Sequence, residues 1–362
     1  MNIPCKPALP LRPRPICIVG AGGIVSDAHL PAYKLAGFTV AGICDLDRGR
    51  AEQLAANFGI ARVYENAAQM IAAAPADAVY DVAVTASSLL KVLDLLPEGA
   101  PVLLQKPMGE DLAMAQSILA CCRRKGLLAG VNFQLRFAPF VIAARWLLEQ
   151  GHLGQIYDAE VRVTVDTPWQ FFPFLQKQPR LEVLYHSIHY IDLFRSLLGN
   201  PASVMGRTLR HPTKELTSTR SAIILDYGDT LRAVISVNHD HSFGARNHES
   251  FIKLEGTGGA IKARMGLLMD YPRGLPDTFE YALLGQSTES VWQEQPLEGS
   301  WFPHAFIGTM ASLMRYAEGT DSILSIGVED AIQTMAVVEA VYRSNAGGGE
   351  PLPVLQAESL RP

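Results

Sequence analysis

The sequence is poor in charge and in long apolar runs. Only 19% of its 362 residues are charged, the formal net charge is −5, and Lys and Arg form no cluster. These features argue against a nucleic-acid or anionic-membrane surface. No apolar run reaches the roughly 18–20 residues of a membrane span. The start, MNIPCKPALPLRPRP, has no secretory hydrophobic segment. We therefore expect a cytoplasmic protein with a small-molecule partner.

Cysteine is also scarce, and it is poorly spaced for disulfides or metal binding. There are five cysteines, none in a CxxC arrangement. Cys17 and Cys44 lie in apolar, strand-like segments, Cys121 and Cys122 are adjacent, and Cys5 lies in a proline-rich arm. An odd number with this spacing is typical of reduced thiols in the cytoplasm.

The first 135 residues alternate short apolar runs with helical patterns. This alternation predicts a parallel sheet covered by helices on both faces. The predicted strands are 15–20, 38–45, 78–84, 101–106 and 127–133. One predicted helix starts near residue 26, and the others lie near 47–59, 65–74, 87–96 and 110–125.

The pattern changes after about residue 150. Extended segments then follow one another with turns between them, which predicts a mostly antiparallel sheet with one long helix inserted at about 180–199. The strand segments are 155–166, 221–228, 230–241, 250–257 and 259–266, and helices at 304–318 and 327–345 close the chain. We divide the sequence into a flexible arm (1–14), a doubly wound α/β domain (15–135), an α+β domain (136–345) whose closing helix can pack back on the first domain, and a tail (346–362).

The segment GAGGIV (20–25) lies between the first predicted strand and a helix, as in dinucleotide-binding domains. Gly20 permits a tight turn, and Gly22 lets backbone amides approach a pyrophosphate. The third fingerprint position holds Val25 instead of Gly or Ala, so we expect the helix to pack slightly farther from the strand. A glycine turn without a ligand is the alternative.

Asp45 ends the second predicted strand, 20 residues after Val25. A carboxylate at this place binds both ribose hydroxyls and repels a 2′-phosphate, so NAD is favoured over NADP. Arg48 and Arg50 are close enough in sequence to weaken that preference. The predicted cofactor contacts are Gly20, Gly22, Gly23, Ile24, Asp45, Leu46, Thr85, Gln105 and Lys106.

Lys106 stands at the carboxyl end of a predicted parallel strand and is followed by Pro107. Ligands of such sheets bind beyond these strand ends. A partly desolvated lysine beside an oxidised nicotinamide should have a lowered pKa. It can then accept a substrate hydroxyl proton while hydride leaves the same carbon. A solvated surface lysine is the alternative.

Glu182, His186 and His189 fall at i, i+4 and i+7 of the predicted helix and so share one face. They align to within about 20° but spread over about 10 Å of helix axis, whereas zinc needs ligands about 2 Å from one point. We therefore predict no metal site. The remaining interpretations are internal pairs, Glu182 with His186 and His189 with Asp192, or a row that faces substrate.

The chain resembles the Gfo/Idh/MocA oxidoreductases in ICIVGAGGIVSDAHLPAY, QKP and HSIHYIDLFRSLLG, in that order and spacing. The resemblance implies a Rossmann domain and an α+β domain whose open sheet often forms an oligomer interface, here in a homodimer or homotetramer. It also implies NAD(P)-dependent oxidation or reduction of sugars, inositols and related polyols.

The family's Glu-Lys-Pro motif falls on Gln105, Lys106 and Pro107, so an amide replaces the acid and Lys106 should lose its proton more easily. The family's catalytic histidine falls on His189. The aspartate usually found four residues earlier is replaced by Tyr185, which we expect to bind substrate through a hydrogen bond from its hydroxyl but not to stabilise an imidazolium. Glu182 and His186 are candidates to supply the missing polar function to the substrate.

Other segments are expected to shape the substrate pocket. Asn132 and Arg136 follow the last parallel strand, where the family has a similar Arg-Phe pair. The stretch TPWQFFPF (167–174), with Trp169, suits a lid or a face for sugar stacking, and equally a subunit contact. His239 and His241 alternate along a strand edge, where satisfied histidines are common.

Two other functions remain open at this point. A protein of this family can use NAD transiently, as a sugar-modifying lyase, epimerase or glycosidase. The replacements at Gln105 and Tyr185 also leave open a non-catalytic protein that senses the nucleotide.

Overall fold

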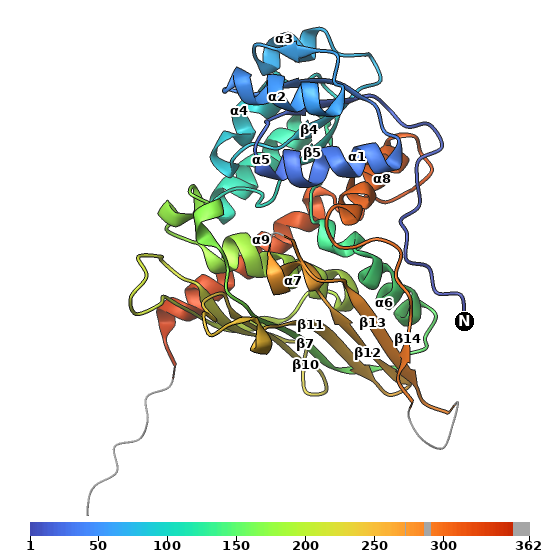
Figure 1. Cartoon of the computed structure of the whole chain (residues 1–362), viewed down its shortest axis with the longest axis vertical. Coiled ribbons are helices and arrows are strands. Elements are labelled where there is room, and N and C mark those ends of the chain that lie inside the picture. Colours follow the sequence, from blue (N-terminus) through green and yellow to red (C-terminus); the bar gives the residue numbers. More distant parts are fainter. Residues whose placement is uncertain (272, 286–290, 350–362) are drawn as a thin grey trace, which may run out of the picture.

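The computed structural model describes residues 1–271, 273–285 and 291–349, so most of the predicted tail lies outside the described residues. Figure 1 shows a nucleotide-binding type of domain above a broad second sheet, with helices between the two. Within the described ranges no helix is long and apolar enough to cross a membrane.

The first domain contains a parallel sheet of six strands in the order β3-β2-β1-β4-β5-β6. This order is the doubly wound nucleotide-binding arrangement, and it confirms the predicted fold class and all five predicted strands. The two-residue strand β3 was missed, because it is too short to carry a pattern. The strands are β1 Ile16–Val19, β2 Val40–Cys44, β3 Val63–Tyr64, β4 Val79–Val82, β5 Pro101–Leu104 and β6 Leu128–Val131. Helix α1 (Leu30–Ala36) is preceded by a π turn at Val25–His29. The other helices are α2 Arg48–Phe58, α3 Ala67–Ala72, α4 Leu89–Leu95 and α5 Leu112–Arg124.

The second domain contains an eight-stranded sheet in the order β14-β13-β12-β11-β7-β10-β9-β8. Among the described strands of this sheet, β7 and β10 alone pair in parallel, so the prediction of a mostly antiparallel sheet is confirmed. The strands are β7 Ile156–Thr164, β8 Ser203–Leu209, β9 Arg220–Asp226, β10 Arg232–Asn238, β11 Glu249–Gly256, β12 Gly259–Arg264, β13 Thr278–Leu283 and β14 Gln293–Glu294.

Four elements of this domain were not predicted: β8, β13, β14 and helix α6 (Pro139–Glu149). Strand β8 lies at the sheet edge, and Gly206 is its single buried residue, so the strand lacks an apolar alternation. Along β9 and β11, by contrast, alternate residues are buried on the helix-covered face.

Helices α7, α8 and α9 lie around the junction of the two domains, and α9 contacts both of them. Helix α7 (Ile188–Leu198) packs beside α9 (Val328–Gly347), and α9 also contacts α5 and β8. Helix α8 (His304–Ala317) packs on α1 and β5. Both closing helices, α8 and α9, therefore contact elements of the nucleotide domain.

The N-terminal arm has no helix or strand, which its prolines predict. It nevertheless lies along the body of the protein (Figure 1) and is not loose, in contrast to our expectation. The backbone amides of Leu11 and Arg12 donate to the Glu318 carboxylate at 2.9 and 3.0 Å, and the Arg14 guanidinium donates to the carbonyl of Ala317. These contacts fasten the arm to the end of α8.

Candidate active site

The glycine turn after β1 has the geometry of a dinucleotide cradle. Gly20 has φ +111°, and a Cβ atom there would lie 2.4 Å from the Ala83 carbonyl oxygen, so a side chain is excluded. A Cβ on Gly22 would meet no atom within 4 Å, which leaves its backbone open to a ligand. With Gly23, Gly22 lines a cavity of about 310 Å³ beside the start of the helix. These residues fit a pyrophosphate.

Asp45 connects the end of β2 to this turn. Its carboxylate accepts hydrogen bonds from the amides of Ala21 at 2.6 Å and Asp47 at 2.8 Å. Each oxygen retains lone-pair capacity for a ribose hydroxyl. Arg48 pairs with Glu52 at 2.8 Å and Arg50 with Asp47 at 3.1 Å, so both arginines expected to weaken the NAD preference are already engaged.

The remaining predicted cofactor contacts lie around the same edge of the sheet. Ile24 precedes the π turn, Leu46 and Thr85 are exposed after β2 and β4, and Gln105 and Lys106 follow β5. Ligands of doubly wound sheets bind at this edge. Val25, at the third fingerprint position, is the first residue of the wider π turn.

Asn132 directly follows β6, and its side chain is buried. Its side-chain amide lies 3.1 Å from Nε2 of the buried His29, whose Nδ1 lies 2.7 Å from the Asp81 carboxylate. The Tyr33 hydroxyl donates to the same carboxylate at 2.7 Å. Asn132 thus belongs to a buried network inside the nucleotide domain through its amide nitrogen. Its Oδ1 atom has no hydrogen-bond partner among the described residues, so a contact of Asn132 with substrate stays a prediction.

Lys106 is half-buried, and its ammonium donates to the backbone carbonyl of Tyr185 at 2.9 Å. The side chain of Gln105 turns back to accept from the Lys106 amide at 3.1 Å. No carboxylate among the described residues forms an ion pair with Lys106. Burial lowers the pKa of Lys106 to about 8, which confirms the predicted direction.

The helix that carries the histidines begins later than predicted and with a different geometry. Val183–Ser187 form a π turn, and the α-helix starts only at Ile188. Glu182 precedes the turn, and its carboxylate accepts from the Ser187 hydroxyl at 2.7 Å. Glu182 is 0% exposed. The predicted straight row of Glu182, His186 and His189 is therefore wrong, because the wider turn displaces its first member into the core.

His189 lies at the start of α7, with its ring edge-on to Trp301 at a centroid distance of 6.2 Å. Burial, and then the Lys106 charge, hold the pKa of His189 well below its ordinary value, so the imidazole is neutral. Its Nδ1 atom has no hydrogen-bond partner among the described residues.

Arg136 has a structural role that sequence reasoning did not identify. It donates to both oxygens of Asp192 at 2.6 Å, to Asp330 at 2.5 Å and to the carbonyl of Ser325 at 2.6 Å. Four of its five N–H groups are thus engaged inside the protein. The expected contact of Arg136 with substrate is corrected, and the proposed pair of His189 with Asp192 is excluded.

His186 belongs to an aromatic cluster with Trp169 and His239. The His186 ring lies 4.5 Å from that of His239 and 5.4 Å from that of Trp169. Burial first, and then the nearby His239, Lys106 and His189 side chains, hold the pKa of His186 well below its ordinary value. Trp169 is only 7% exposed, so its face cannot act as an open stacking platform.

The two strand-end histidines, His239 and His241, lie in different surroundings. His239 Nδ1 lies 2.8 Å from the Thr167 hydroxyl, and its Nε2 lies 3.8 Å from Glu182. His241 instead packs on Phe243 and His248. His239 therefore approaches the site through His186, whereas His241 does not.

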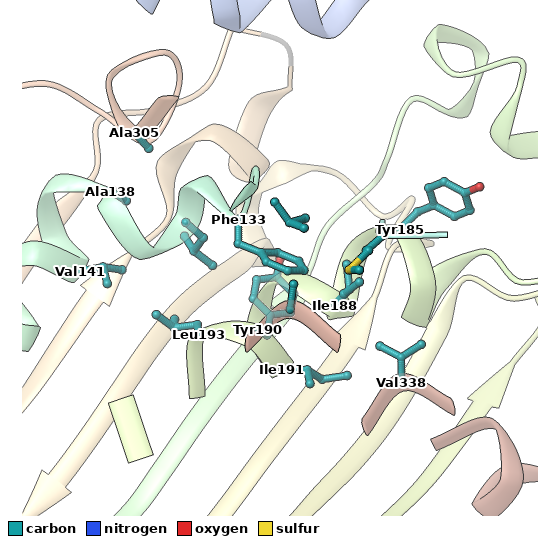
Figure 2. Packing of buried hydrophobic residues seen from close by; sticks show 14 of the residues in the cluster. Phe133, Ala138, Val141, Tyr185, Ile188, Tyr190, Ile191, Leu193, Ala305 and Val338 are labelled. Atoms are coloured by element: carbon teal, nitrogen blue, oxygen red, sulfur yellow. The ribbon is translucent and has the colours of Figure 1, made fainter. Parts of the chain in front are cut away.

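The Tyr185 side chain points away from the packed core. Figure 2 shows its hydroxyl directed outward from the packed cluster around Phe133 and Ile188. Its ring lies 6.1 Å from that of Phe174. Burial, and then Glu110, raise the pKa of the phenol to about 12. Only the backbone carbonyl of Tyr185 meets Lys106, so the side chain does not replace the missing aspartate.

The structure therefore brings together Lys106, His189 and His186 from the predicted set, beyond the carboxyl end of β5. Sequence reasoning gave no role to Trp301, Thr167 or Ser187. Thr167 and Ser187 lie in segments singled out above, but only the fold shows that their side chains contact His239 and Glu182, and Trp301 lies in no such segment. Within the described ranges, no three His, Cys, Asp or Glu side chains are placed to hold a metal ion. A neutral imidazole beside a lysine that can lose its proton is suited to moving a hydroxyl proton.

Comparison with known proteins identifies both domains. Residues 15–133 match the family model "Oxidoreductase family, NAD-binding Rossmann fold", and residues 145–354 match "Oxidoreductase family, C-terminal alpha/beta domain". D-apiose dehydrogenase of Rhizobium rhizogenes is 26% identical over 344 residues, which cover 91% of this chain and 95% of that protein.

Two solved structures show the same fold. An oxidoreductase from Agrobacterium radiobacter in complex with NAD+, L-tartaric acid and magnesium aligns with a TM-score of 0.77 and 22% identity, covering 93% of this chain and 98% of that one. Levoglucosan dehydrogenase in complex with NADH and levoglucosan aligns with a TM-score of 0.76 and 16% identity, with the same coverage.

Proposed function

Because this chain belongs to the Gfo/Idh/MocA oxidoreductase family and carries its NAD-binding domain, we propose that it oxidises a secondary carbinol of a sugar or polyol. Lys106 and His189 handle the hydroxyl proton. The observation that carries this proposal is a half-buried lysine that has no anionic partner in the described part of the chain. Its pKa is lowered to about 8, and it lies at the strand end that faces the nucleotide site.

The roles of the two side chains follow from their charge states. Bound NAD+ supplies a nicotinamide that takes up hydride. The neutral amine of Lys106 accepts the hydroxyl proton as that hydride leaves, and its lowered pKa keeps a useful fraction neutral near pH 7–8. The neutral His189 offers one donor or acceptor to the same hydroxyl and so orients it.

A hydroxyl-rich substrate matches the polar atoms around this site. His186 Nδ1, His189 Nδ1 and Trp169 Nε1 have no hydrogen-bond partner among the described residues. Buried polar groups of this kind are usually satisfied by water or ligand. The relatives named D-apiose dehydrogenase and levoglucosan dehydrogenase support a sugar or a closely related polyol.

Lys106→Met tests the proposal. We expect this variant to bind NAD+ nearly as wild type but to produce no NADH with any member of a panel of aldoses, sugar lactones and inositols. Lys125→Met is a matched control, since the Lys125 amine also donates to a backbone carbonyl of the same domain, that of Asp94, at 2.6 Å. Full activity of Lys106→Met would contradict the assignment. Product formation without net NADH would instead indicate transient use of NAD.

Assembly and location form part of the proposal. Met205 and Ile224 pair across β8 and β9, and their side chains are 57% and 44% exposed on the uncovered face of the second sheet. An apolar pair of this kind favours self-association through that face, as a homodimer or homotetramer. All five cysteines are free, which agrees with a cytoplasmic location. Light scattering of wild type and of Met205→Lys tests the assembly, since only the variant should be monomeric.

A further inference from the structure

Oxidation at this site leaves a proton on Lys106, and that proton must reach solvent before the next turnover. A carbinol and NAD+ give a carbonyl group, NADH and one proton, which the Lys106 amine accepts. The lysine is half-buried, and its ammonium donates to the Tyr185 carbonyl at 2.9 Å. A backbone carbonyl is too weakly basic to take the proton over. The next acceptor is therefore one of the two neighbouring imidazoles, His186 or His189.

The surroundings of His189 do not carry a proton onward. Its ring lies edge-on to that of Trp301, with 6.2 Å between the centroids. The indole N–H of a tryptophan is a donor only, so it cannot accept a proton from the imidazole. His189 is thus suited to orienting the substrate hydroxyl, and the proton must leave by another side chain.

His186 has a neighbour that can accept a proton. It directly follows Tyr185, whose carbonyl binds the Lys106 ammonium, and its ring lies 4.5 Å from that of His239. After burial and His239, the Lys106 charge is the next influence that lowers the pKa of His186, so the ammonium lies near this imidazole. At this ring separation, small rotations bring a nitrogen of each imidazole within hydrogen-bond distance of the other.

His239 makes the contacts that a transfer group needs. Its Nδ1 atom lies 2.8 Å from the Thr167 hydroxyl, and its buried Nε2 atom has no hydrogen-bond partner in the described part of the chain. A neutral imidazole of this kind accepts a proton at Nε2 and releases one from Nδ1. The buried Glu182 carboxylate, 3.8 Å from Nε2, stabilises the positive charge while the proton passes.

Thr167 places the end of this path at solvent. The residue is half-buried and lines a cleft of about 540 Å³, whose wall also carries the exposed carboxylates of Asp166 and Glu215. The Lys214 ammonium of the same cleft is neutralised by Asp240 at 2.8 Å, so it does not oppose an arriving positive charge. A threonine hydroxyl both accepts and donates, and it can therefore hand a proton to water in the cleft.

We propose that His186, His239 and Thr167 form a proton relay that carries the product proton from Lys106 to solvent in this cleft. The inference rests on the proposed function. Lys106 returns to its neutral amine, and each imidazole accepts a proton at one nitrogen and releases one from the other. The Thr167 oxygen accepts from His239 Nδ1 as it gives its own hydrogen to water. No electrons move in these steps, and the proton released is the one that the oxidation produces.

The test measures NADH formation and proton release together. Stopped-flow absorbance follows NADH, and phenol red in weak buffer follows the proton, with the aldose, sugar lactone or inositol that wild type oxidises fastest. In wild type both should appear together in the first turnover. In His239→Gln and in Thr167→Val, NADH should form at the wild-type rate in that turnover, whereas proton release should be slower by about tenfold or more. A merely structural role of these residues would slow NADH formation as well.

Two further variants complete the test. Thr167→Ser keeps a hydroxyl and should restore prompt proton release. His241→Gln is the matched control, because this other strand-end histidine packs on Phe243 and lies outside the relay. Prompt proton release in both His239→Gln and Thr167→Val, with NADH still formed, would overturn the relay and leave the proposed function standing. Absence of NADH from wild type with every sugar of the panel would overturn the proposed function, and the relay with it.

Discussion

Lys106→Met is expected to stabilise the protein while it removes activity. Burial lowers the pKa of Lys106 from 10.5 to about 8, so keeping this amine protonated in the folded protein costs about 3 kcal/mol. The variant avoids this cost, but it also loses the hydrogen bond from Lys106 to the Tyr185 carbonyl, which lowers the free energy of unfolding by about 1 kcal/mol. A net increase of about 2 kcal/mol in the free energy of unfolding therefore remains at pH 7.

The sign of the pH dependence follows from linkage. The unfolded chain binds this proton more tightly than the folded protein, so wild-type stability rises with pH between about 8 and 10.5. The advantage of Lys106→Met should thus be complete below pH 8 and should decline above it. Urea unfolding of both proteins at pH 7 and pH 10 measures this difference, and Lys125→Met, at an exposed site, controls for the loss of a lysine. A variant that is less stable than wild type, by the same amount at both pH values, would refute the reasoning.

Three further predictions concern activity, the cofactor and the fold. The kcat/KM for oxidation should rise about tenfold from pH 7 to a plateau above pH 9, since the neutral fraction of Lys106 increases through its pKa of about 8; a flat profile would contradict its role as a base. Asp45→Asn should weaken NAD+ binding about tenfold and reduce the preference over NADP+, as fluorescence titration can measure, whereas an unchanged preference would exclude Asp45 from ribose binding. Arg136→Ala should destabilise the protein by about 3–5 kcal/mol in urea unfolding, because it leaves Asp192 buried without its cation; a loss below about 1 kcal/mol would show that Arg136 has no such structural role.

Most of the fold could be predicted because its signals are local. The buried strands of the nucleotide domain are continuous apolar runs, and the acid after β2 lies at a fixed place in the dinucleotide fingerprint. Strand β8 was not predicted, because an edge strand whose single buried residue is Gly206 has almost no pattern of apolar residues.

The site was harder to predict because its geometry depends on tertiary contacts. A single π turn at Val183–Ser187 moves Glu182 out of register, and a pattern read at 3.6 residues per turn cannot anticipate it. The partners of Arg136 lie 56 and 194 residues away along the chain, at Asp192 and Asp330, so nothing near Arg136 in the sequence reveals its ion pairs.

The central claim is that Lys106 serves as the proton acceptor in NAD-dependent oxidation of a sugar or polyol. The most direct measurement is NADH formation from the substrate panel by wild type and by Lys106→Met, each saturated with NAD+ in a separately measured binding titration. We predict NADH formation by wild type alone with at least one sugar, at equal cofactor occupancy. Equal rates in the two proteins would contradict the account.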